Sequence, residues 1–326
     1  MDTLRIGFMG AGFIAGIHAE VLARDPRVSV HAVIDPDLQR VTTFALNTGA
    51  AVVPSLDDLL GEVDALYICT PNALHADVAI HALDAGVSVF SEKPMATSLD
   101  DARAVLDASQ RARGVYQAGF NRRFAGVYRE LKHRLASGDV VLSSALLKMN
   151  RGELRRPAWT GDPLVSGGFL YETPIHMLDL TRYLFGEPVE VVCRARATVY
   201  DQLDDFSMLF TFESGASAVF ATSAHATWLF PFERVEVYGE HAAIVTEEME
   251  RITFSTGDQQ AALTLDFAQQ PRDERWGYIE ADGRFVDAIC GVGEPAVSAA
   301  EAFATTQLVE RCYAAAREAD AAAPSS

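Results

Sequence analysis

The feature that most constrains this fold is a glycine turn between a short apolar segment and a helical one. Residues 4–9 are apolar enough to form a buried strand, and residues 13–24 have helical periodicity. Between them, Gly10, Gly12 and Ala15 have the spacing GxGxxA. Gly10 permits a tight turn, Gly12 lets the backbone approach a pyrophosphate, and Ala15 lets the helix pack closely on the strand. The N–H groups and positive dipole at the helix start favour the same anion, so the segment predicts a dinucleotide site.

Strand and helix continue to alternate up to about residue 119. Further strands are expected at 28–34, 65–69, 87–90 and 115–118, and helices at 38–47, 75–85 and 99–112. Ser98 and Asp101 form a capping box at the start of the last of these helices. Short buried strands that alternate with helices form a parallel, doubly wound sheet. We therefore predict an α/β fold with a dinucleotide-binding domain over residues 1–119.

Longer strands joined by short turns follow residue 120. Strands are expected at 140–149, 189–200, 206–212, 216–224, 234–238 and 243–247, and helices at 124–135, 174–184, 281–289 and 299–317. Turns such as Glu213-Ser214-Gly215 separate consecutive strands, which is typical of an antiparallel sheet. This pattern predicts a C-terminal α+β domain over residues 120–326.

The charge balance excludes several classes of partner. The chain has 326 residues, with 45 acidic and 27 basic side chains and a formal net charge of −18. Such a chain repels phosphate backbones and anionic membrane surfaces, so we expect no nucleic-acid or membrane partner. No apolar run reaches transmembrane length, and the first residues lack the pattern of a signal peptide. Four widely spaced cysteines indicate reduced thiols in a cytoplasmic protein rather than a disulfide scaffold or a metal site.

Asp35 bears on the choice of cofactor. It ends the second predicted strand about 20 residues after the glycine turn, where an acid binds both ribose hydroxyls of NAD. A carboxylate there repels the 2′-phosphate of NADP, so NAD is favoured. The alternative is that Asp35 caps a helix or forms a turn before Pro36, and the nearby Arg40 leaves NADP open.

Two further segments follow predicted strands at the end where ligands bind in such sheets, namely TPNALH at 70–75 and EKP at 92–94. In order with GxGxxA, GFNRRF at 119–124 and GGFLYETPIHMLDL at 167–180, they resemble the Gfo/Idh/MocA oxidoreductases. The resemblance extends over nearly the whole chain. It implies a Rossmann domain and a second domain with an open, mostly antiparallel sheet that binds substrate and forms oligomers. It also implies hydride transfer between a nicotinamide and a hydroxyl or carbonyl carbon of a sugar, amino sugar or cyclitol.

The resemblance implies that Lys93 and His176 are catalytic. Glu172 matches an acid that is Asp in many members, so its carboxylate stands one methylene further out. With Thr173 as the N-cap and Pro174 as the first helical residue, His176 would lie in the first turn of a helix. The helix dipole there favours a neutral, basic imidazole, whereas Glu172 opposes that effect.

These roles can also be argued from the reaction. Oxidation of an alcohol needs a base for the hydroxyl proton, which suits His176. Lys93 could donate a hydrogen bond to the reacting oxygen and stabilise its developing charge. The two residues are far apart in sequence, so we expect a cleft between the domains to bring them together. The alternatives are a structural histidine beside Asp179 and a surface lysine at a strand end.

The remaining predicted contacts form two groups. The predicted cofactor-binding residues are Gly10, Gly12, Phe13, Ile14, Asp35, Thr70, Asn72, His75, Glu92 and Lys93. The predicted substrate contacts are Arg123, Trp159, Trp228 and Phe230. Alternatives stay open for several of them: His75 exposed at a helix start, Arg123 paired with a carboxylate on the acidic surface, and the aromatic rings packed in the core. His18, in the first helix, is expected to be structural or solvent-facing.

The leading interpretation is an NAD-dependent dehydrogenase or reductase acting on CH–OH groups, with a sugar or cyclitol as substrate. An NAD-dependent glycosidase that oxidises its substrate transiently, and a redox-silent NAD-binding regulatory protein, are the alternatives. The presence of both Lys93 and His176 favours an enzyme.

Two structural expectations complete the prediction. The resemblance implies a cis bond between Lys93 and Pro94. Phe206, Met208, Phe210 and Phe212 alternate along one strand, and the opposite face of that strand, with Leu209, is also apolar. A sheet that is apolar on both faces needs two covers, which predicts a homodimer or homotetramer formed through the C-terminal sheet.

Overall fold

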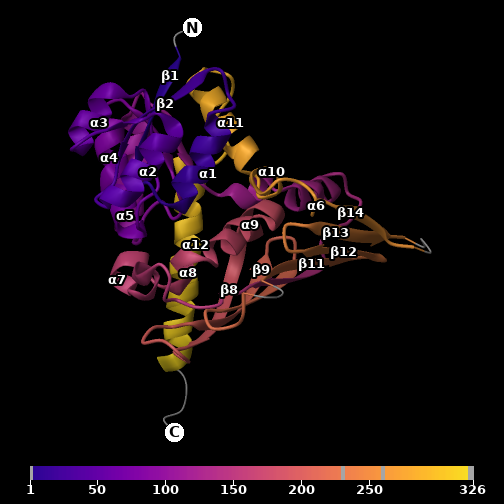
Figure 1. Cartoon of the computed structure of the whole chain (residues 1–326). Helices are drawn as coiled ribbons and strands as arrows, with labels where there is room; N and C mark the ends of the chain where they lie inside the picture. Colours follow the sequence, from indigo (N-terminus) through magenta and orange to yellow (C-terminus); the bar gives the residue numbers. More distant parts are fainter. Residues whose placement is uncertain (1–2, 229–231, 258–260, 322–326) are drawn as a thin grey trace. The chain divides into compact units, whose positions relative to one another are not determined.

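The computed structural model describes residues 3–228, 232–257 and 261–321 of the chain (Figure 1). The chain divides into two compact units. Unit 1 comprises Met1–Asn121 and Tyr278–Thr306, and unit 2 comprises Arg122–Gly277 and Gln307–Ser326. The first division lies two residues from the expected boundary at 119/120. The segment 278–306, however, was expected in the second domain and belongs to unit 1.

Helix α11 (Tyr278–Ile289) explains this difference, because it packs beside α1 (Phe13–Leu22) in unit 1 (Figure 1). The ring of Phe285 lies 5.6 Å from the rings of both Tyr67 and Phe90. Asp282 is hydrogen-bonded to His18 on α1. These are contacts across more than 190 residues of sequence, and no local pattern reveals them.

The sheet of unit 1 has the predicted doubly wound topology. Its strands in the described part of the chain are β1 (Leu4–Met9), β2 (Val28–Ile34), β3 (Ala51–Val52), β4 (Ala65–Ile68), β5 (Ser88–Ser91) and β6 (Tyr116–Ala118). Their order is β3-β2-β1-β4-β5-β6, and every neighbouring pair is parallel. The helices between them are α2 (Leu38–Thr48), α3 (Leu56–Glu62), α4 (His75–Asp84) and α5 (Leu99–Arg111). The Rossmann fold is confirmed, and β3 and α3 are additions that the sequence patterns did not predict.

Local signals explain how these elements are built. The predicted capping box is present, since the Asp101 N–H donates to Ser98 Oγ at 3.1 Å. Stacked aromatic rings fill the centre of the sheet, with 4.6 Å between the rings of Tyr67 and Phe90 and 5.1 Å between those of Phe8 and Tyr67. These buried rings pack β1, β4 and β5 against one another, and the predicted cofactor residues follow the carboxyl ends of these strands.

The sheet of unit 2 is mostly antiparallel, as predicted. Its strands are β7 (Ser144–Met149), β8 (Pro188–Arg196), β9 (Asp205–Phe212), β10 (Ser217–Ser223), β11 (Glu233–Gly239), β12 (Ala242–Glu247), β13 (Arg251–Thr256) and β14 (Leu263–Asp266). Their order among the described residues is β14-β13-β12-β11-β7-β10-β9-β8, in which β7 and β10 alone run parallel. The unit also contains α6 (Gly126–Ala136), α7 (Pro163–Ser166), α8 (Phe169–Glu172), α9 (Ile175–Phe185) and α10 (Arg272–Arg275), and it shares α12 (Ala299–Ala321) with unit 1.

The two faces of this sheet differ in burial. Phe206, Met208, Phe210 and Phe212 are buried, as their alternation predicts. On the opposite face, four exposed apolar side chains are aligned by the strand register: Val192 with Leu209, Leu209 with Val219, and Val219 with Leu146. We call Val192, Leu209, Val219 and Leu146 the apolar row. Its members are between 40% and 47% exposed.

Candidate functional site

The glycine turn has the geometry that a dinucleotide requires. Gly10 has a φ of +98°, and a Cβ added there would lie 2.5 Å from the carbonyl oxygen of Cys69. Gly12 is the N-cap residue of α1, and no side chain caps this helix start. A Cβ added at Gly12 would meet no described atom within 4 Å, so the space in front of the helix is open. An uncapped helix start behind an open glycine fits a pyrophosphate, and Phe13 and Ile14 form the first helical positions there.

Asp35 lies beside this turn at the end of β2. Its Oδ2 accepts the N–H of Ala11 at 2.8 Å, and its Oδ1 accepts the N–H of Asp37 at 2.8 Å. The N-cap of α2 is Asp37, so Asp35 is not a helix cap, but its bond to the N–H of Asp37 forms a side-chain turn around Pro36, which is the other part of the alternative interpretation. Because a carboxylate offers about four acceptor positions, two remain for the hydroxyls of a ribose. Arg40 is exposed, and its Nε lies 3.3 Å from Asp37 Oδ2.

His75 joins the two loops that follow β4 and β5. It is buried, with Nδ1 2.6 Å from the carbonyl oxygen of Pro94 and Nε2 2.9 Å from that of Thr70. The alternative of an exposed His75 is therefore wrong. Burial lowers the pKa of His75 more than these backbone contacts raise it. Both ring nitrogens lie close to backbone oxygens of these loops, and a neutral ring can donate its single N–H to one of the two.

The loop after β4 also contains predicted cofactor residues. Thr70 Oγ1 is buried and has no hydrogen-bond partner among the residues that the structure describes. Asn72 is buried at the start of the short 3-10 turn Asn72–Leu74. An orphaned hydroxyl at the carboxyl end of a Rossmann strand fits a polar group of a bound dinucleotide.

The EKP segment follows β5. Glu92 is buried, its Oε1 lies 3.2 Å from His18 Nε2, and its Oε2 accepts the N–H of Lys93 at 3.2 Å. Lys93 itself is half-buried, and the Lys93–Pro94 peptide bond is cis, as predicted. His18 is fully buried, so the solvent-facing alternative for it is wrong.

In unit 2, Glu172 and His176 lie on either side of the start of α9. His176 is buried in the first helical turn, and its N–H donates to the carbonyl oxygen of Thr173 at 3.3 Å. Thr173 was predicted as the N-cap, but the N-cap is Pro174. The hydroxyl of Thr173 instead donates to Glu172, which reaches it from the end of α8.

Arg151 anchors Glu172, and sequence reasoning missed it. Its Nη1 lies 2.5 Å from Glu172 Oε2 and donates to Thr173 Oγ1 at 3.0 Å. Its Nε and Nη2 donate to the carbonyl oxygens of Glu153 and Arg156 at 2.7 and 3.2 Å. A buried guanidinium that contacts a carboxylate at this distance fixes the position of that carboxylate. The only sequence signal was an arginine two residues after the end of a predicted strand.

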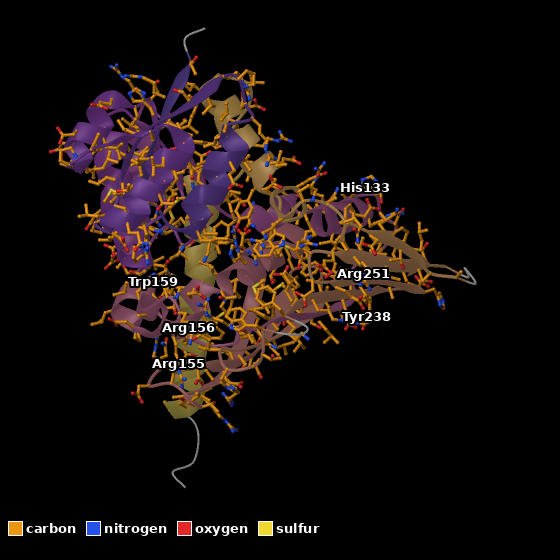
Figure 2. All side chains as sticks on the ribbon, in the orientation of Figure 1. His133, Arg155, Arg156, Trp159, Tyr238 and Arg251 are labelled. Carbon is orange, nitrogen blue, oxygen red and sulfur yellow. The ribbon has the colours of Figure 1, made fainter. Side chains whose placement is uncertain are left out.

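The predicted substrate contacts differ in what the structure shows for them. Arg123 forms a two-pronged ion pair with Asp179, with Nε–Oδ2 and Nη2–Oδ1 distances of 2.8 and 2.6 Å. The alternative of a paired arginine is therefore correct, but the carboxylate is buried and does not lie on the surface. Trp159 is half-buried in the short turn Ala158–Gly161, close in sequence to Arg155 and Arg156 (Figure 2). Phe230 lies outside the described residues.

Trp228 is half-exposed and borders a cavity of about 440 Å³. The cavity lining is rich in aromatic and ionisable side chains and comprises Trp228, Phe232, Glu248, Met249, Glu250, Arg275 and Trp276. The guanidinium carbon of Arg151 lies 5.4 Å from the centre of the Trp228 ring. Arg151 therefore touches both Glu172 and a wall of this cavity.

The described residues contain no group of three or more His, Cys, Asp or Glu side chains placed to hold a metal ion. None of the helices in the described ranges is long and apolar enough to cross a membrane.

Comparisons with known proteins agree with this geometry. Residues 4–120 match the model of the Gfo/Idh/MocA oxidoreductase family, NAD-binding Rossmann fold, and residues 128–245 match the Gfo/Idh/MocA C-terminal domain. The uncharacterised oxidoreductase YrbE of Bacillus subtilis is 30% identical over 87% of this chain and 85% of its own. Myo-inositol 2-dehydrogenase of Thermotoga maritima is 27% identical over 90% and 91%. The crystal structure of a putative myo-inositol dehydrogenase from Sinorhizobium meliloti is 26% identical, with a TM-score of 0.83 over 97% and 98% of the two chains.

Proposed function

The chain belongs to the Gfo/Idh/MocA family of oxidoreductases, and from this premise we propose that it transfers a hydride between NAD and a secondary hydroxyl or carbonyl carbon of a sugar, amino sugar or cyclitol. The observation that carries the proposal is the start of α9, where His176 lies four residues after a carboxylate that Arg151 anchors. A fixed carboxylate near a histidine is an arrangement suited to holding a hydroxyl group and moving its proton.

Each catalytic side chain has a proposed task. When bound, NAD supplies the hydride acceptor or donor. His176 takes the hydroxyl proton during oxidation and returns it during reduction. Lys93 donates a hydrogen bond to the same oxygen and stabilises its developing negative charge. Glu172 accepts a hydrogen bond from a neighbouring substrate hydroxyl, and Arg151 fixes it for that purpose.

The substrate class is proposed from the lining of the cavity beside Trp228. Indole rings pack well against the apolar faces of sugar and cyclitol rings, while carboxylates accept hydroxyl groups. Trp228 and Trp276 supply the rings, and Glu248 and Glu250 supply carboxylates in the same cavity. The name of the Thermotoga relative makes myo-inositol the first compound to test.

A substrate panel tests the proposal. Purified protein is incubated with NAD and a set of inositols, hexoses and amino sugars, and NADH formation is followed by absorbance. We expect steady NADH production with at least one of them. Glycoside hydrolysis without net NADH would instead indicate the glycosidase alternative, and NAD binding without any turnover would indicate the regulatory one.

Cofactor preference is tested separately. Asp35 beside an open glycine turn leads us to propose tighter binding of NAD than of NADP. Titrating the protein fluorescence with each reduced cofactor measures both dissociation constants. Replacing Asp35 by serine should bring the two dissociation constants closer together, because it removes the repulsion between the carboxylate and the 2′-phosphate of NADP. Equal or tighter binding of NADP by the unmodified protein contradicts the proposal.

A further inference from the structure

A chain of buried polar contacts crosses unit 1 and ends at Lys93. Asp282 Oδ1 lies 2.7 Å from His18 Nδ1, and His18 Nε2 lies 3.2 Å from Glu92 Oε1. The other carboxylate oxygen of Glu92 accepts the N–H of Lys93. The three side chains and the Lys93 backbone come from α11, from α1 and from the loop after β5, so the chain links three separate elements.

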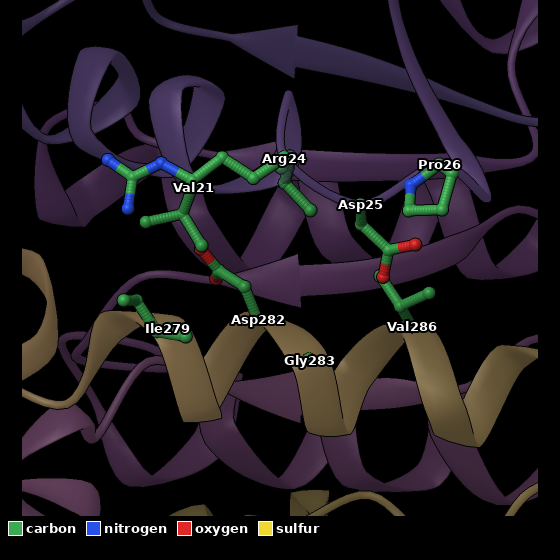
Figure 3. Close-up of a pocket in the computed structure, with 9 residues that line it drawn as sticks. Val21, Arg24, Asp25, Pro26, Ile279, Asp282, Gly283 and Val286 are labelled. Atoms are coloured by element: carbon green, nitrogen blue, oxygen red, sulfur yellow. The ribbon is translucent and has the colours of Figure 1, made fainter.

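Burial raises the pKa of Asp282, the first member of this chain, and the charge and hydrogen bond of His18 oppose that rise. Figure 3 shows Asp282 rising from α11 with its carboxylate below Val21 of α1, at the edge of a cavity of about 360 Å³. Asp282 is only 1% exposed. Its Oδ1 is bound by His18 and by the hydroxyl of Tyr67 at 3.3 Å, whereas its Oδ2 has no hydrogen-bond partner in the described part of the chain. A buried carboxylate with one unpaired oxygen is costly unless a cation neutralises it.

His18 is placed to be that cation. Both ring nitrogens face carboxylates, which neutral imidazole cannot satisfy because it has a single N–H. Burial alone would lower the pKa of His18, but the charges and hydrogen bonds of Asp282 and Glu92 outweigh it and raise the pKa to about 10. Burial opposes the ionised form of Glu92, yet its hydrogen bond to His18 leaves the pKa of Glu92 lowered. The other neighbours of the ring are aromatic: Tyr67, Phe90 and Tyr278.

The absence of a side chain at Gly119 leaves space for the Glu92 carboxylate. A Cβ added at Gly119 would lie 2.9 Å from Glu92 Oε1, so only glycine leaves the carboxylate where it is. Glu92 is thus confined between His18 and the backbone of Gly119, next to Lys93. The remaining titratable groups that act on this carboxylate are Lys93, His75 and Cys69.

We propose that His18 is a positioning residue for Lys93: as a buried imidazolium held by Asp282 it fixes the Glu92 carboxylate, and Glu92 fixes the Lys93 backbone and places a negative charge beside the ammonium group. This inference rests on the proposed function, in that Lys93 is taken to bind the reacting oxygen. The physical consequence is that loss of the His18 charge acts on catalysis through Glu92, and not through the packing of α1 alone.

The protonation state of His18 is measured without any assay of activity. In protein labelled with ¹⁵N at histidine, NMR should show His18 with both ring nitrogens protonated and no titration between about pH 6 and pH 9. In Asp282→Asn the carboxylate partner is lost, so the titration should move down into this range. A neutral His18 ring at pH 7 in the unmodified protein overturns the proposal, whether or not Lys93 proves to be catalytic.

Kinetics distinguish positioning from packing. In His18→Gln, Glu92 is buried without its cation, so its carboxyl group takes up a proton at higher pH than before. We expect kcat to fall at least tenfold at low pH and to recover as the pH rises, with an unchanged dissociation constant for NADH. Glu92→Gln should lack this pH-dependent recovery, and the double variant should behave like Glu92→Gln. Losses that are equal at every pH, and additive in the double variant, would show that His18 is merely structural.

Two controls keep the test decisive. His81→Gln changes an exposed histidine on α4 of the same unit, and its kinetics should match those of the unmodified protein. Circular dichroism establishes that each variant is folded, and if His18→Gln is not, the NMR measurement on the unmodified protein still decides. If Lys93→Ala retains full turnover while His18 is found protonated, the proposed function of Lys93 fails and the buried ion chain stands.

Discussion

The His176 imidazole is presented by the first turn of α9, and the nearby Glu172 is anchored by Arg151. We predict that His176→Ala lowers kcat by about 10²- to 10⁴-fold, which is the usual contribution of a general base. NAD affinity should change little, because the proposed dinucleotide contacts lie in unit 1. Steady-state kinetics on the substrate found in the panel, with a fluorescence titration of NADH, measures both quantities.

His133→Ala serves as the matched control for this change. His133 is an exposed histidine of the same unit, on α6 (Figure 2), and we expect no effect of its removal. Near-normal turnover of His176→Ala would make His176 structural, and the base would then be sought at Lys93 or Glu172.

The raised pKa of His18 also predicts how stability depends on pH. The folded pKa of about 10 lies above the ordinary value of 6.5, so folding favours the protonated ring. This contribution is complete below about pH 6.5 and is lost as the pH rises through 10. The His18 contribution to the free energy of urea unfolding should therefore decline between pH 7 and 9, by at most about 1.4 kcal/mol per pH unit.

Other groups titrate near the upper end of this range. Burial raises the pKa of the thiols of Cys69, Cys193 and Cys312, so these groups also lower stability as the pH approaches 9 and unfolded thiols ionise. His18→Gln should therefore flatten the decline between pH 7 and 8 and reduce it between pH 8 and 9. An equal slope in both proteins would mean that His18 does not carry the proton.

Among the elements, the turn between β1 and α1 is the most restrictive. Gly10 has a positive φ, and an added Cβ would collide with a backbone carbonyl of the loop after β4. We predict that Gly10→Ala destabilises the protein by at least about 1–2 kcal/mol, the strain of the left-handed conformation, and weakens NAD binding. Gly16→Ala is the control, since Gly16 lies within α1 and no described atom is within 4 Å of its added Cβ. That change should stabilise α1 by up to about 1 kcal/mol.

Denaturant unfolding gives the free energy of unfolding of Gly10→Ala and Gly16→Ala, and titration with NADH gives their dissociation constants. If the two alanine variants behaved alike, the turn would not require glycine at position 10, and the fit of a pyrophosphate in front of Gly12 would lose its support.

Elements with a strong local sequence pattern could be predicted, whereas elements with a weak pattern could not. The glycine turn, the capping box at Ser98 and the alternation of β9 all appear in the structure within a few residues of their predicted bounds. Strand β3 has two exposed residues and β14 is largely exposed, so neither has a hydrophobic pattern to detect. Strand β3 forms only because β2 offers it a hydrogen-bonding edge.

The candidate site shows the same division. Spacing and resemblance predict Lys93, Glu172 and His176 as site residues, but they do not predict the partners that hold Glu92 and Glu172. Arg151 reaches Glu172 across 21 residues, and Asp282 reaches His18 across 264. Such partners are selected by the folded geometry, and a single sequence contains no local signal for them.

For the whole molecule, the apolar row on the outer face of the unit 2 sheet predicts self-association. Four aligned apolar side chains on adjacent strands form a continuous exposed stripe, which is typical of a protein–protein interface. With a net charge of −18 on each chain, copies repel one another, so a stable contact must come from apolar burial at a place such as this.

We predict a homodimer or homotetramer for the unmodified protein by light scattering at micromolar concentration. Leu209→Glu introduces a charge at the centre of the row and should shift the mass to that of a monomer. Leu46→Glu, which changes an isolated exposed leucine on α2 in unit 1, should leave the mass unchanged. A monomeric mass for the unmodified protein would show that no such interface forms. An oligomer that persists in Leu209→Glu would show that the interface lies on another surface.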